Sequence, residues 1–402
     1  MSAALLIVSL AAIVLGLYWA VMLGHVVATR VRLPTAREAL RLPEATPGAQ
    51  APSLCVVVPA HNEADVIGEL AASLARQDYP SFSAVFALDR CTDGTAGAIR
   101  RAIGDDPRFE LVPVETCPPD WAGKVNAICT ALERSTAAAR AEVLVFADAD
   151  TRFEPGLLRA AVALLRARGL DMVSLLSRLA STRGFERVIQ PAAALELMRQ
   201  YPVLRANRAE RRRAFANGQF IMVRREPYER LGGHRTVHDQ LFEDVHLARQ
   251  AERHGLRVGV FVSGGLLHCR MYPDYAAFKR GWNRIYADAA NLKPGRLRAS
   301  AVRLRLVGTV LPALAAAGVV LGATTRTENS GLALWSGGLG LVAYFVALAA
   351  AYRLGGMPVA TVPLYPVGAW RTASILRRAA RDLETQRAVR WGGREYARAV
   401  RE

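Results

Sequence analysis

The chain has 402 residues, of which 52% are hydrophobic and only 7% aromatic, and it carries 52 Lys and Arg against 35 Asp and Glu. The resulting net charge of +17 favours negatively charged partners, such as lipid headgroups, phosphorylated substrates or nucleic acid. The five cysteines are scattered and never form a C-x-x-C pair, which argues against a disulfide framework and a zinc site and indicates a reducing compartment.

The first segment of the chain, residues 1–29, contains no Asp, Glu, Lys or Arg. A helix rises about 1.5 Å per residue, so a helix of this length can cross a hydrocarbon core of roughly 30 Å. The segment lacks the basic start and the short apolar core of a cleaved signal peptide. We therefore expect a transmembrane helix here, followed by a basic linker in residues 30–52.

Short apolar runs alternate with amphipathic segments in residues 53–275, the central domain. The runs Leu54–Ala60 and Phe82–Asp89 predict buried strands, and the stretch between them predicts a helix. Repetition of strand and helix at this spacing predicts an α/β domain with a mostly parallel, Rossmann-like sheet that is covered on both faces. No G-x-G-x-x-G follows the first strand, and Gly123 and Lys124 lack the rest of a P-loop, so neither type of nucleotide site is indicated.

Carboxylates follow two of the predicted strands. Asp89 closes the second strand, and the sequence E-V-L-V-F-A-D-A-D places Asp148 and Asp150 at the end of a later one. Ligands of open α/β sheets bind beyond the carboxyl ends of the strands, so we expect these three side chains in one crevice. Two carboxylates at this spacing can share Mg²⁺ or Mn²⁺ and leave open positions for the oxygens of a diphosphate. The alternative is that Asp148 and Asp150 only cap a turn.

Two further apolar runs, residues 306–323 and 331–352, predict two more transmembrane helices near the C-terminus. Arginines flank the apolar runs on the side of the central domain, so the positive-inside rule predicts an external N-terminus and a cytosolic central domain at the cell inner (plasma) membrane. Residues 276–305 are expected to form a membrane-interface segment. Residues 354–370 are expected to form a Pro-rich re-entrant or transmembrane segment, and residues 371–402 a basic cytosolic tail.

Several motifs occur in the order seen in family 2 glycosyltransferases of the GT-A fold, which the chain resembles. They read VVVPAHNEADVIGELAASLARQDYP, LDRCTDGTA, PDWAGKVNAICTAL, VFADADTRFEP and FEDVHLARQAERHG, and the similarity covers residues 53–286. The later portion, from DMVSLLSRLASTRGFERVIQP to NGQFIMVRREPYERLGGH, resembles the membrane-bound branch near the hopene-associated and ceramide-glucosyltransferase-like enzymes. The tail R-W-G-G-R-E-Y resembles the closing motif of that branch.

This resemblance implies a nucleotide-sugar donor, in the first place a UDP-sugar, a divalent metal (Mn²⁺ or Mg²⁺) and an inverting transfer. Asp244, which forms an E-D pair with Glu243, is implied as the general base. Asp148 and Asp150 are implied as the D-x-D pair that binds the metal. The residues implied to bind the donor are Pro59, His61, Asn62, Glu63, Asp89, Lys124, Asp148 and Asp150.

The chain departs from the family pattern in two places. Leu88 stands where many members have a first aspartate, so only Asp89 remains. In F-K-R-G-W-N-R-I-Y, Gly281 breaks the adjacency of arginine and tryptophan that related enzymes show, which argues against processive polysaccharide synthesis. The candidates for contact with the acceptor or the diphosphate are Glu243, Arg280, Trp282 and Arg284. The alternative for the last three is a basic, aromatic anchor at the membrane interface.

The expected function is therefore that of a membrane-bound hexosyltransferase which moves one sugar from a nucleotide-sugar to a lipid acceptor, with no nucleic acid as partner. One alternative is transfer to a polyprenyl phosphate, whose anionic oxygen needs no base. The other alternative is a catalytically silent GT-A module that serves as a membrane scaffold in a lipid pathway.

Overall fold

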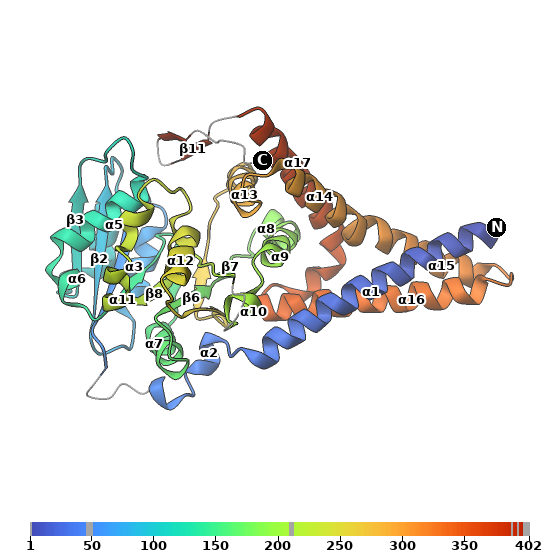
Figure 1. Ribbon diagram of the computed structural model, residues 1–402, viewed down its shortest axis with the longest axis horizontal. Helices are drawn as coiled ribbons and strands as arrows, with labels where there is room; N and C mark the ends of the chain where they lie inside the picture. Colours follow the sequence, from blue (N-terminus) through green and yellow to red (C-terminus); the bar gives the residue numbers. More distant parts are fainter. Residues whose placement is uncertain (1, 46–50, 209–212, 387–388, 392–393, 397–402) are drawn as a thin grey trace. The chain divides into compact units, whose positions relative to one another are not determined.

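The computed structural model describes residues 2–45, 51–208, 213–386, 389–391 and 394–396 (Figure 1). The chain forms two compact units. The first unit contains Met1–Arg32, Ser181–Gln200 and Tyr272–Glu402, and the second contains Leu33–Ala180 and Tyr201–Met271.

The second unit is built on a seven-stranded sheet with the strand order β3-β2-β1-β4-β8-β6-β9. The strands are β1 Leu54–Ala60, β2 Phe82–Asp89, β3 Phe109–Val114, β4 Val143–Phe146, β6 Met172–Leu176, β8 Ile221–Arg224 and β9 Val258–Val262. Every neighbouring pair is parallel except the two that involve β8, which runs antiparallel to both β4 and β6. The mixed α/β fold with a mostly parallel sheet is therefore confirmed.

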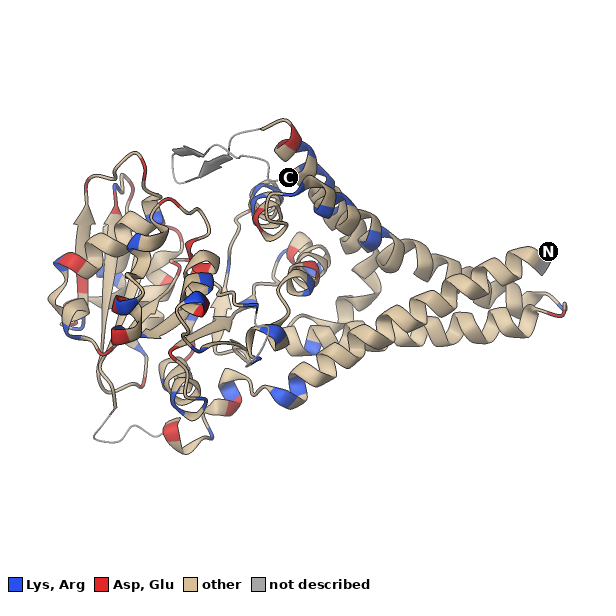
Figure 2. Ribbon diagram, viewed as in Figure 1, with Lys and Arg blue, Asp and Glu red and all other residues tan. Residues whose placement is uncertain are grey.

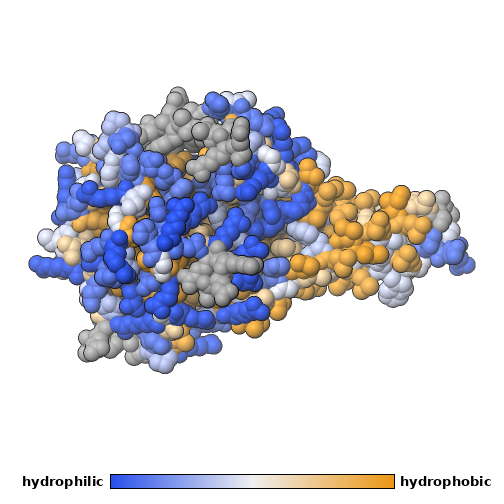
Figure 3. Space-filling view, in the orientation of Figure 1, coloured by the Kyte–Doolittle hydropathy of each residue, from blue (hydrophilic) through white to orange (hydrophobic). Residues whose placement is uncertain are grey.

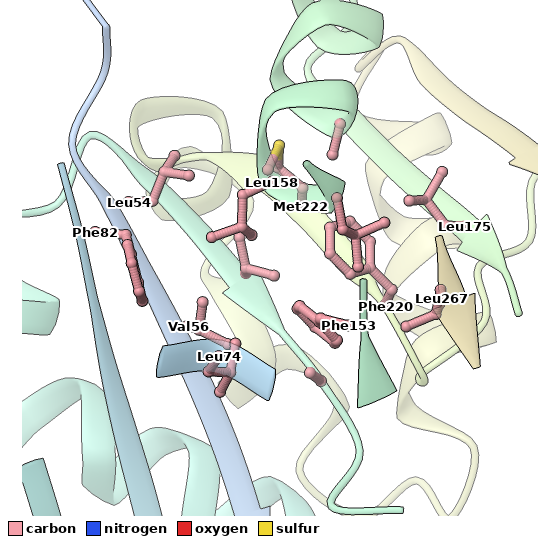
Figure 4. Close-up of a cluster of buried hydrophobic side chains, with 14 of the residues drawn as sticks. Leu54, Val56, Leu74, Phe82, Phe153, Leu158, Leu175, Phe220, Met222 and Leu267 are labelled. Atoms are coloured by element: carbon pink, nitrogen blue, oxygen red, sulfur yellow. The ribbon is translucent and has the colours of Figure 1, made fainter. Parts of the chain in front are cut away.

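Helices cover both faces of this sheet because successive residues of each buried strand point to opposite sides. Val56 and Val58 belong to one hydrophobic core, whereas Cys55 and Val57 belong to the other. The first core, part of which is drawn in Figure 4, lies under α3, α4 and α7. These helices are Ile67–Ala75, Thr95–Ile103 and Leu157–Ala167. The second core lies under α5, α6 and α12, which are Gly123–Arg134, Thr136–Arg140 and Glu243–Arg253.

The predicted strands match β1 and β2 at both ends, but two neighbouring elements differ from their predictions. β4 ends at Phe146, two residues before Asp148, because the chain turns at the D-A-D sequence. The sequence of residues 122–140, AGKVNAICTALERSTAAAR, predicts one helix, but the structure divides it into α5 and α6. Ser135 divides it because its backbone is extended and its hydroxyl accepts a hydrogen bond from the N–H of Ala138 (3.0 Å), which caps α6.

Smaller elements complete the second unit. A three-stranded sheet has the order β5-β10-β7, with the bounds Thr151–Phe153, Leu267–Cys269 and Arg178–Leu179. The short helices are α2 Ala36–Ala39, α10 Val203–Ala206, α11 Arg225–Arg230 and the 3₁₀ turns η1 Pro43–Ala45 and η2 Gly233–Val237.

The first unit contains three long apolar stretches that are long enough to cross a membrane, judged by length and composition. They are α1 Ser2–Arg32, the continuous helical stretch Pro294–Thr324 and α16 Ser330–Gly355. The stretch Pro294–Thr324 consists of α14 Pro294–Arg305, a π turn (η3, Leu306–Val310) and α15 Leu311–Thr324. Charged residues are absent along most of α1, α15 and α16 (Figure 2), and apolar side chains cover their surface (Figure 3).

Small residues let these helices approach one another closely. A Cβ atom at Gly340 of α16 would lie 2.6 Å from the carbonyl oxygen of Ala12 on α1, and one at Gly337 would lie 2.6 Å from that of Ala315 on α15. Helices that share an apolar environment associate through such close backbone contacts, because burying more apolar surface gives them no advantage over lipid.

The rest of the first unit consists of shorter helices. They are α8 Gly184–Val188, α9 Gln190–Gln200, α13 Tyr275–Ala289, the 3₁₀ turn η4 Val359–Leu364 and α17 Tyr365–Glu384, followed by the strand pair β11 Val389–Trp391 and β12 Arg394–Tyr396. The expected Pro-rich segment thus forms η4 and the start of α17, which continues across the expected boundary at residue 371. The tail motif R-W-G-G-R-E-Y includes residues 392–393, which lie outside the described residues.

Residues 181–200 fall inside the expected central domain but belong to the first unit. In the first unit α9 packs on α17 and α13, and a buried carboxylate of α9 is paired there as well. Glu196 is 2% exposed and forms ion pairs with Arg199 (2.8 Å) and with Arg303 of α14. A buried carboxylate is stable only when it is paired, so α9 depends on the basic residues of α14.

Replacing Phe220 with Ala should destabilise the second unit. Its side chain is fully buried, and its ring centroid lies 5.6 Å from that of Phe153. Truncation of a buried Phe removes apolar contacts and leaves a cavity, at a cost of about 3–5 kcal/mol. Thermal unfolding of the full chain in detergent would measure the loss. Phe220→Leu, which retains most of the volume, should lose much less, and equal losses in both variants would contradict this packing.

Candidate active site

Two loops meet at the carboxyl ends of β1 and β2. Asn62, in the loop after β1, accepts a hydrogen bond at Oδ1 from the N–H of Thr92 (2.8 Å), and the N–H of Glu63 donates to Oγ1 of Thr95 (2.9 Å). Asn62 has a φ of +56°, in the left-handed region that Asn adopts more readily than most residues. The predicted donor residues of this loop are therefore fixed against the next strand's loop. Pro59 is buried in β1 itself.

Asp89 is buried at the end of β2, and its carboxylate is paired with the next residue. Arg90 donates from Nε to Oδ1 (2.8 Å) and from Nη2 to Oδ2 (2.7 Å). Arg90 has a φ of +46°, an unfavourable backbone conformation that brings the guanidinium back onto the carboxylate. The ring Nδ1 of His61 lies 2.7 Å from the carbonyl oxygen of Asp89, which joins this pair to the first loop.

The D-A-D sequence forms the turn between β4 and β5. Thr151 closes the turn by donating from its hydroxyl to the main-chain oxygen of Asp148 (2.7 Å). Each of the two carboxylates contacts another side chain. That of Asp148 lies 2.5 Å from Nζ of Lys124, and Oδ1 of Asp150 accepts a hydrogen bond from the thiol of Cys269 (3.4 Å). Both carboxylates thus take part in side-chain interactions away from the turn.

Lys124, in the first turn of α5, connects two of the predicted site residues. Its Nζ lies 2.5 Å from Oδ1 of Asp148 and 2.6 Å from Oε1 of Glu243. Burial alone would lower the pKa of Lys124, but the charges of Asp148, Glu243 and Asp244 together raise it well above its ordinary value. Lys124 is therefore a permanent cation between carboxylates that come from different elements.

Asp244 stands beside this cation, in the first turn of α12. Its two oxygens accept hydrogen bonds from main-chain N–H groups: Oδ2 from Gly218 (2.7 Å) and Oδ1 from Val245 (2.7 Å). Burial and the neighbouring charge of Glu243 nevertheless raise the pKa of Asp244 to about 7. A carboxylate with a fixed orientation and a raised pKa is suited to accept a proton near neutral pH.

Glu63, Asp148 and Asp150 place more negative charge in the site than Lys124 can balance. Burial and the charges of Asp150 and Asp148 raise the pKa of Glu63 to about 7, and burial together with Asp148 raises that of Asp150. Carboxylate oxygens are the ligands that Mg²⁺ and Mn²⁺ prefer, so the pair Asp148 and Asp150 fits such a cation. Within the described residues no group of three or more His, Cys, Asp or Glu side chains is arranged to hold a metal ion.

The structure brings most of the predicted site residues together within the second unit. They are His61, Asn62, Glu63, Asp89, Lys124, Asp148, Asp150, Glu243 and Asp244. Arg280, Trp282 and Arg284 lie on α13 in the first unit. Trp282 is only 2% exposed and packs between Phe278 and Tyr286, so its environment is that of a core residue.

Sequence reasoning missed Arg90 and Gly218. Arg90 follows Asp89 directly in the sequence, so an ion pair between this arginine and the buried aspartate could have been predicted. A Cβ atom at Gly218 would lie 3.0 Å from Nζ of Lys124 and 3.2 Å from Oδ2 of Asp244, so a side chain there would crowd both groups. Only the folded backbone places this glycine between them.

Replacing Lys124 with Met should destabilise the protein in a pH-dependent way. The change leaves the surrounding carboxylates without their cation, at a cost of about 1–3 kcal/mol. The charge of Lys124 lowers the pKa values of Asp150 and Asp244, which burial raises, so without Lys124 these two values rise further above those of the unfolded chain. The loss should therefore be largest at pH 8 and should shrink toward pH 5, where the carboxylates take up protons.

Thermal unfolding of both proteins at pH 5, 6.5 and 8 would measure this difference. Lys124→Arg, which keeps the charge, is the matched control and should retain most of the stability. A loss that is the same at all three pH values would contradict the role of Lys124 as a counter-ion.

The central part of the chain matches a known protein family. A family model described as glycosyltransferase like family 2 matches residues 51–270. The solved structures that match include the mannosyltransferase PcManGT from Pyrobaculum calidifontis in complex with GDP-Man and Mn²⁺. This match has 22% identity and a TM-score of 0.45, and it covers 90% of this chain and 99% of that one.

A second match is TarS 1–349 from S. aureus, at 17% identity and a TM-score of 0.39, over 86% of this chain and 96% of that one. A third is glucosyl-3-phosphoglycerate synthase from Mycobacterium tuberculosis in complex with Mn²⁺, UDP and glucosyl-3-phosphoglycerate. The latter match has 19% identity and a TM-score of 0.40, over 64% of this chain and 84% of that one. A comparison with curated proteins found no match. Because the family model covers more than half of the chain, the chain belongs to glycosyltransferase family 2 and is a glycosyltransferase.

Proposed function

We propose that this glycosyltransferase moves a single sugar from a nucleotide-sugar, in the first place a UDP-sugar, to a lipid acceptor, with inversion at the anomeric carbon and Asp244 as the general base. The observation that carries this proposal is the position of Asp244. It is held by two main-chain N–H groups, and it lies next to Lys124, which is paired with the D-x-D aspartate Asp148.

The proposed reaction is a single displacement. The acceptor hydroxyl attacks the anomeric carbon, Asp244 takes the hydroxyl proton, and the bond between that carbon and the diphosphate oxygen breaks, so that the diphosphate leaves with the bonding electrons. General-base catalysis of this kind needs a carboxylate that is ionised and already oriented. The raised pKa of Asp244 makes it a stronger base than a solvated aspartate. One displacement without an enzyme nucleophile inverts the configuration.

Asp148 and Asp150 are the proposed ligands of a divalent cation. When bound, the cation neutralises charge on the diphosphate as it leaves. The protein would contribute these two carboxylates, with Glu63 close enough to repel both. Mg²⁺ and Mn²⁺ sites commonly use one or two carboxylates and complete the shell with water and phosphate oxygens. The ion pair with Lys124 holds the carboxylate of Asp148 in place.

The loops after β1 and β2 are the proposed site of the nucleoside. His61, Asn62 and Glu63 are fixed against the loop that contains Arg90, at the carboxyl ends of adjacent parallel strands. This is where nucleotides bind in open α/β sheets. The buried Asp89–Arg90 pair presents polar groups at the end of β2.

We also propose that α1, the stretch Pro294–Thr324 and α16 cross the inner (plasma) membrane. Three crossings place the N-terminus outside and leave the second unit and α17 in the cytosol, where nucleotide-sugars are made available. The support is the length and composition of these helices and the arginines near their inner ends. A lipid acceptor could then present its hydroxyl without leaving the bilayer.

Replacing Asp244 with Asn should reduce sugar transfer by a factor of about 10²–10⁴, because the amide cannot accept the hydroxyl proton. Release of nucleoside diphosphate in native lipid extract would measure the rate. Asp239→Asn removes an exposed carboxylate from the preceding loop and should leave the rate unchanged. A loss of less than about tenfold in Asp244→Asn would contradict the base and favour transfer to an anionic polyprenyl phosphate.

The rate should also depend on pH in a defined direction. Asp244 must be ionised to act as a base, and burial raises its pKa to about 7. We expect kcat/KM to rise between pH 5.5 and 7.5 and to level off above that range. Initial rates at saturating metal would test this. A flat profile across the range would show that no group with a raised pKa limits the reaction.

Mn²⁺ should stabilise the protein in the absence of any substrate. The cation relieves the repulsion between Asp148 and Asp150, so its effect on the unfolding temperature should be larger at pH 8 than at pH 5.5, where protons compete for the same oxygens. Asp150→Asn should remove most of this stabilisation, and the exposed Asp105→Asn should not. Equal stabilisation of wild type and Asp150→Asn would place the cation elsewhere.

A further inference from the structure

The π turn η3 in the stretch Pro294–Thr324 is supported from two sides. A π turn widens the helix and leaves main-chain carbonyls without their usual partners. Nε1 of Trp19 on α1 donates to the carbonyl of Val307 (3.1 Å), and the hydroxyl of Tyr344 on α16 donates to that of Gly308 (3.1 Å). The widened turn is thus a specified feature, and such turns are frequent at functional sites.

The residue directly before this turn, Arg305, is positioned by α17. Its guanidinium carbon lies 4.2 Å from the ring centroid of Trp370, and Nη2 lies 3.4 Å from the hydroxyl of Ser374. Its Nε atom is buried and has no hydrogen-bond partner among the described residues. A buried guanidinium N–H that lacks an acceptor carries a free-energy cost, which an additional ligand would remove.

A second arginine increases the positive charge at this position. Arg377 of α17 is exposed and close enough to Arg305 to repel it. Within the described part of the chain, neither arginine has a carboxylate partner. By contrast Arg298, two turns earlier on α14, pairs with Glu384 at 2.6 Å. The charges at one end of the α14–α17 contact are balanced, and those at the Arg305 end are not.

The neighbouring surface is both cationic and apolar. Trp370, Ser374 and Arg377 are spaced by four and three residues, so they lie on one face of α17. Close by in the sequence, Val367 is 53% exposed, Trp370 is 45% exposed and Leu306 is 44% exposed. A free anion would contact only the arginines, whereas a lipid would cover the apolar side chains as well.

We propose that Arg305, Ser374, Arg377 and Trp370 form a binding site for the phosphate of an anionic phospholipid. The phosphate oxygens accept from Nε of Arg305 and from the guanidinium of Arg377, and the acyl chains lie along the exposed apolar residues of α17 and η3. Ser374, whose hydroxyl donates to the carbonyl of Trp370 (3.0 Å), holds Nη2 of Arg305 beside this position. The charge-assisted bonds offset the repulsion between the two arginines. This inference rests on the membrane attachment proposed above, but not on the transferase chemistry.

Native mass spectrometry of the full chain in detergent, with phosphatidylglycerol and phosphatidylcholine added in equal amounts, tests the site. Wild type should retain phosphatidylglycerol preferentially. Arg377→Gln, which leaves the contacts of Arg305 with α17 in place, should weaken this binding about fivefold, the effect expected for one juxtamembrane arginine. Arg305→Lys keeps the charge but loses the planar stack on Trp370, and should weaken it as well.

Arg140→Gln is the matched control, because Arg140 is exposed on α6 in the second unit, and it should bind both lipids as wild type does. Equal retention of the two lipids by wild type, or unchanged preference in Arg377→Gln, would overturn the site. Displacement of the bound lipid by excess glycerol 3-phosphate would show that a free phosphate is the ligand and overturn the lipid assignment.

Extraction of membranes with alkaline carbonate separates this inference from the proposal on which it rests. If alkaline carbonate releases the protein from the membrane, both the proposed membrane attachment and the proposed lipid site are overturned. Retention in the membrane without a preference for phosphatidylglycerol would overturn the lipid site alone, and the transfer reaction would stand or fall by its own assays.

Discussion

The ion pairs of Lys124 are the interaction on which the site depends. One ammonium group holds Asp148, which follows β4, against Glu243, which begins α12. These charges therefore meet only where α12 packs beside the end of the sheet. Because the group is largely buried, the pairing is worth more than it would be on the surface, and its loss would leave like charges facing one another.

This arrangement also separates the roles of the acids. Asp148 is compensated by Lys124, Asp89 by Arg90, and Asp244 by two main-chain N–H groups. Among the described residues Asp150 and Glu63 have no comparable partner, and burial together with repulsion by neighbouring carboxylates raises the pKa of each. The site therefore contains one carboxylate that is suited to accept a proton and a group of carboxylates that is suited to a cation. Different environments give similar side chains different chemistry.

Much of this could be predicted from the sequence, because it follows from local patterns. The runs of β1 and β2 are apolar and bounded by turn residues, and both strands have the predicted ends. The three apolar helices are apparent from composition alone. The membership of residues 181–200 in the first unit was not predictable, because it depends on contacts of α9 with distant helices. One of these contacts is the ion pair of Glu196 with Arg303, 107 positions later in the sequence. The roles of Gly218 and the π turn depend in the same way on contacts between distant segments.

The central claim is that Asp148 and Asp150 bind a cation that serves sugar transfer from a nucleotide-sugar. The most direct measurement is release of nucleoside diphosphate from a panel of nucleotide-sugars by the purified protein in native lipid extract, with Mn²⁺, Mg²⁺ or EDTA, beside Asp150→Ala. The account predicts metal-dependent release with one donor, which is lost in the variant. Release that persists in EDTA and in Asp150→Ala would contradict the account. No release with any donor would also contradict it and would favour the catalytically silent scaffold.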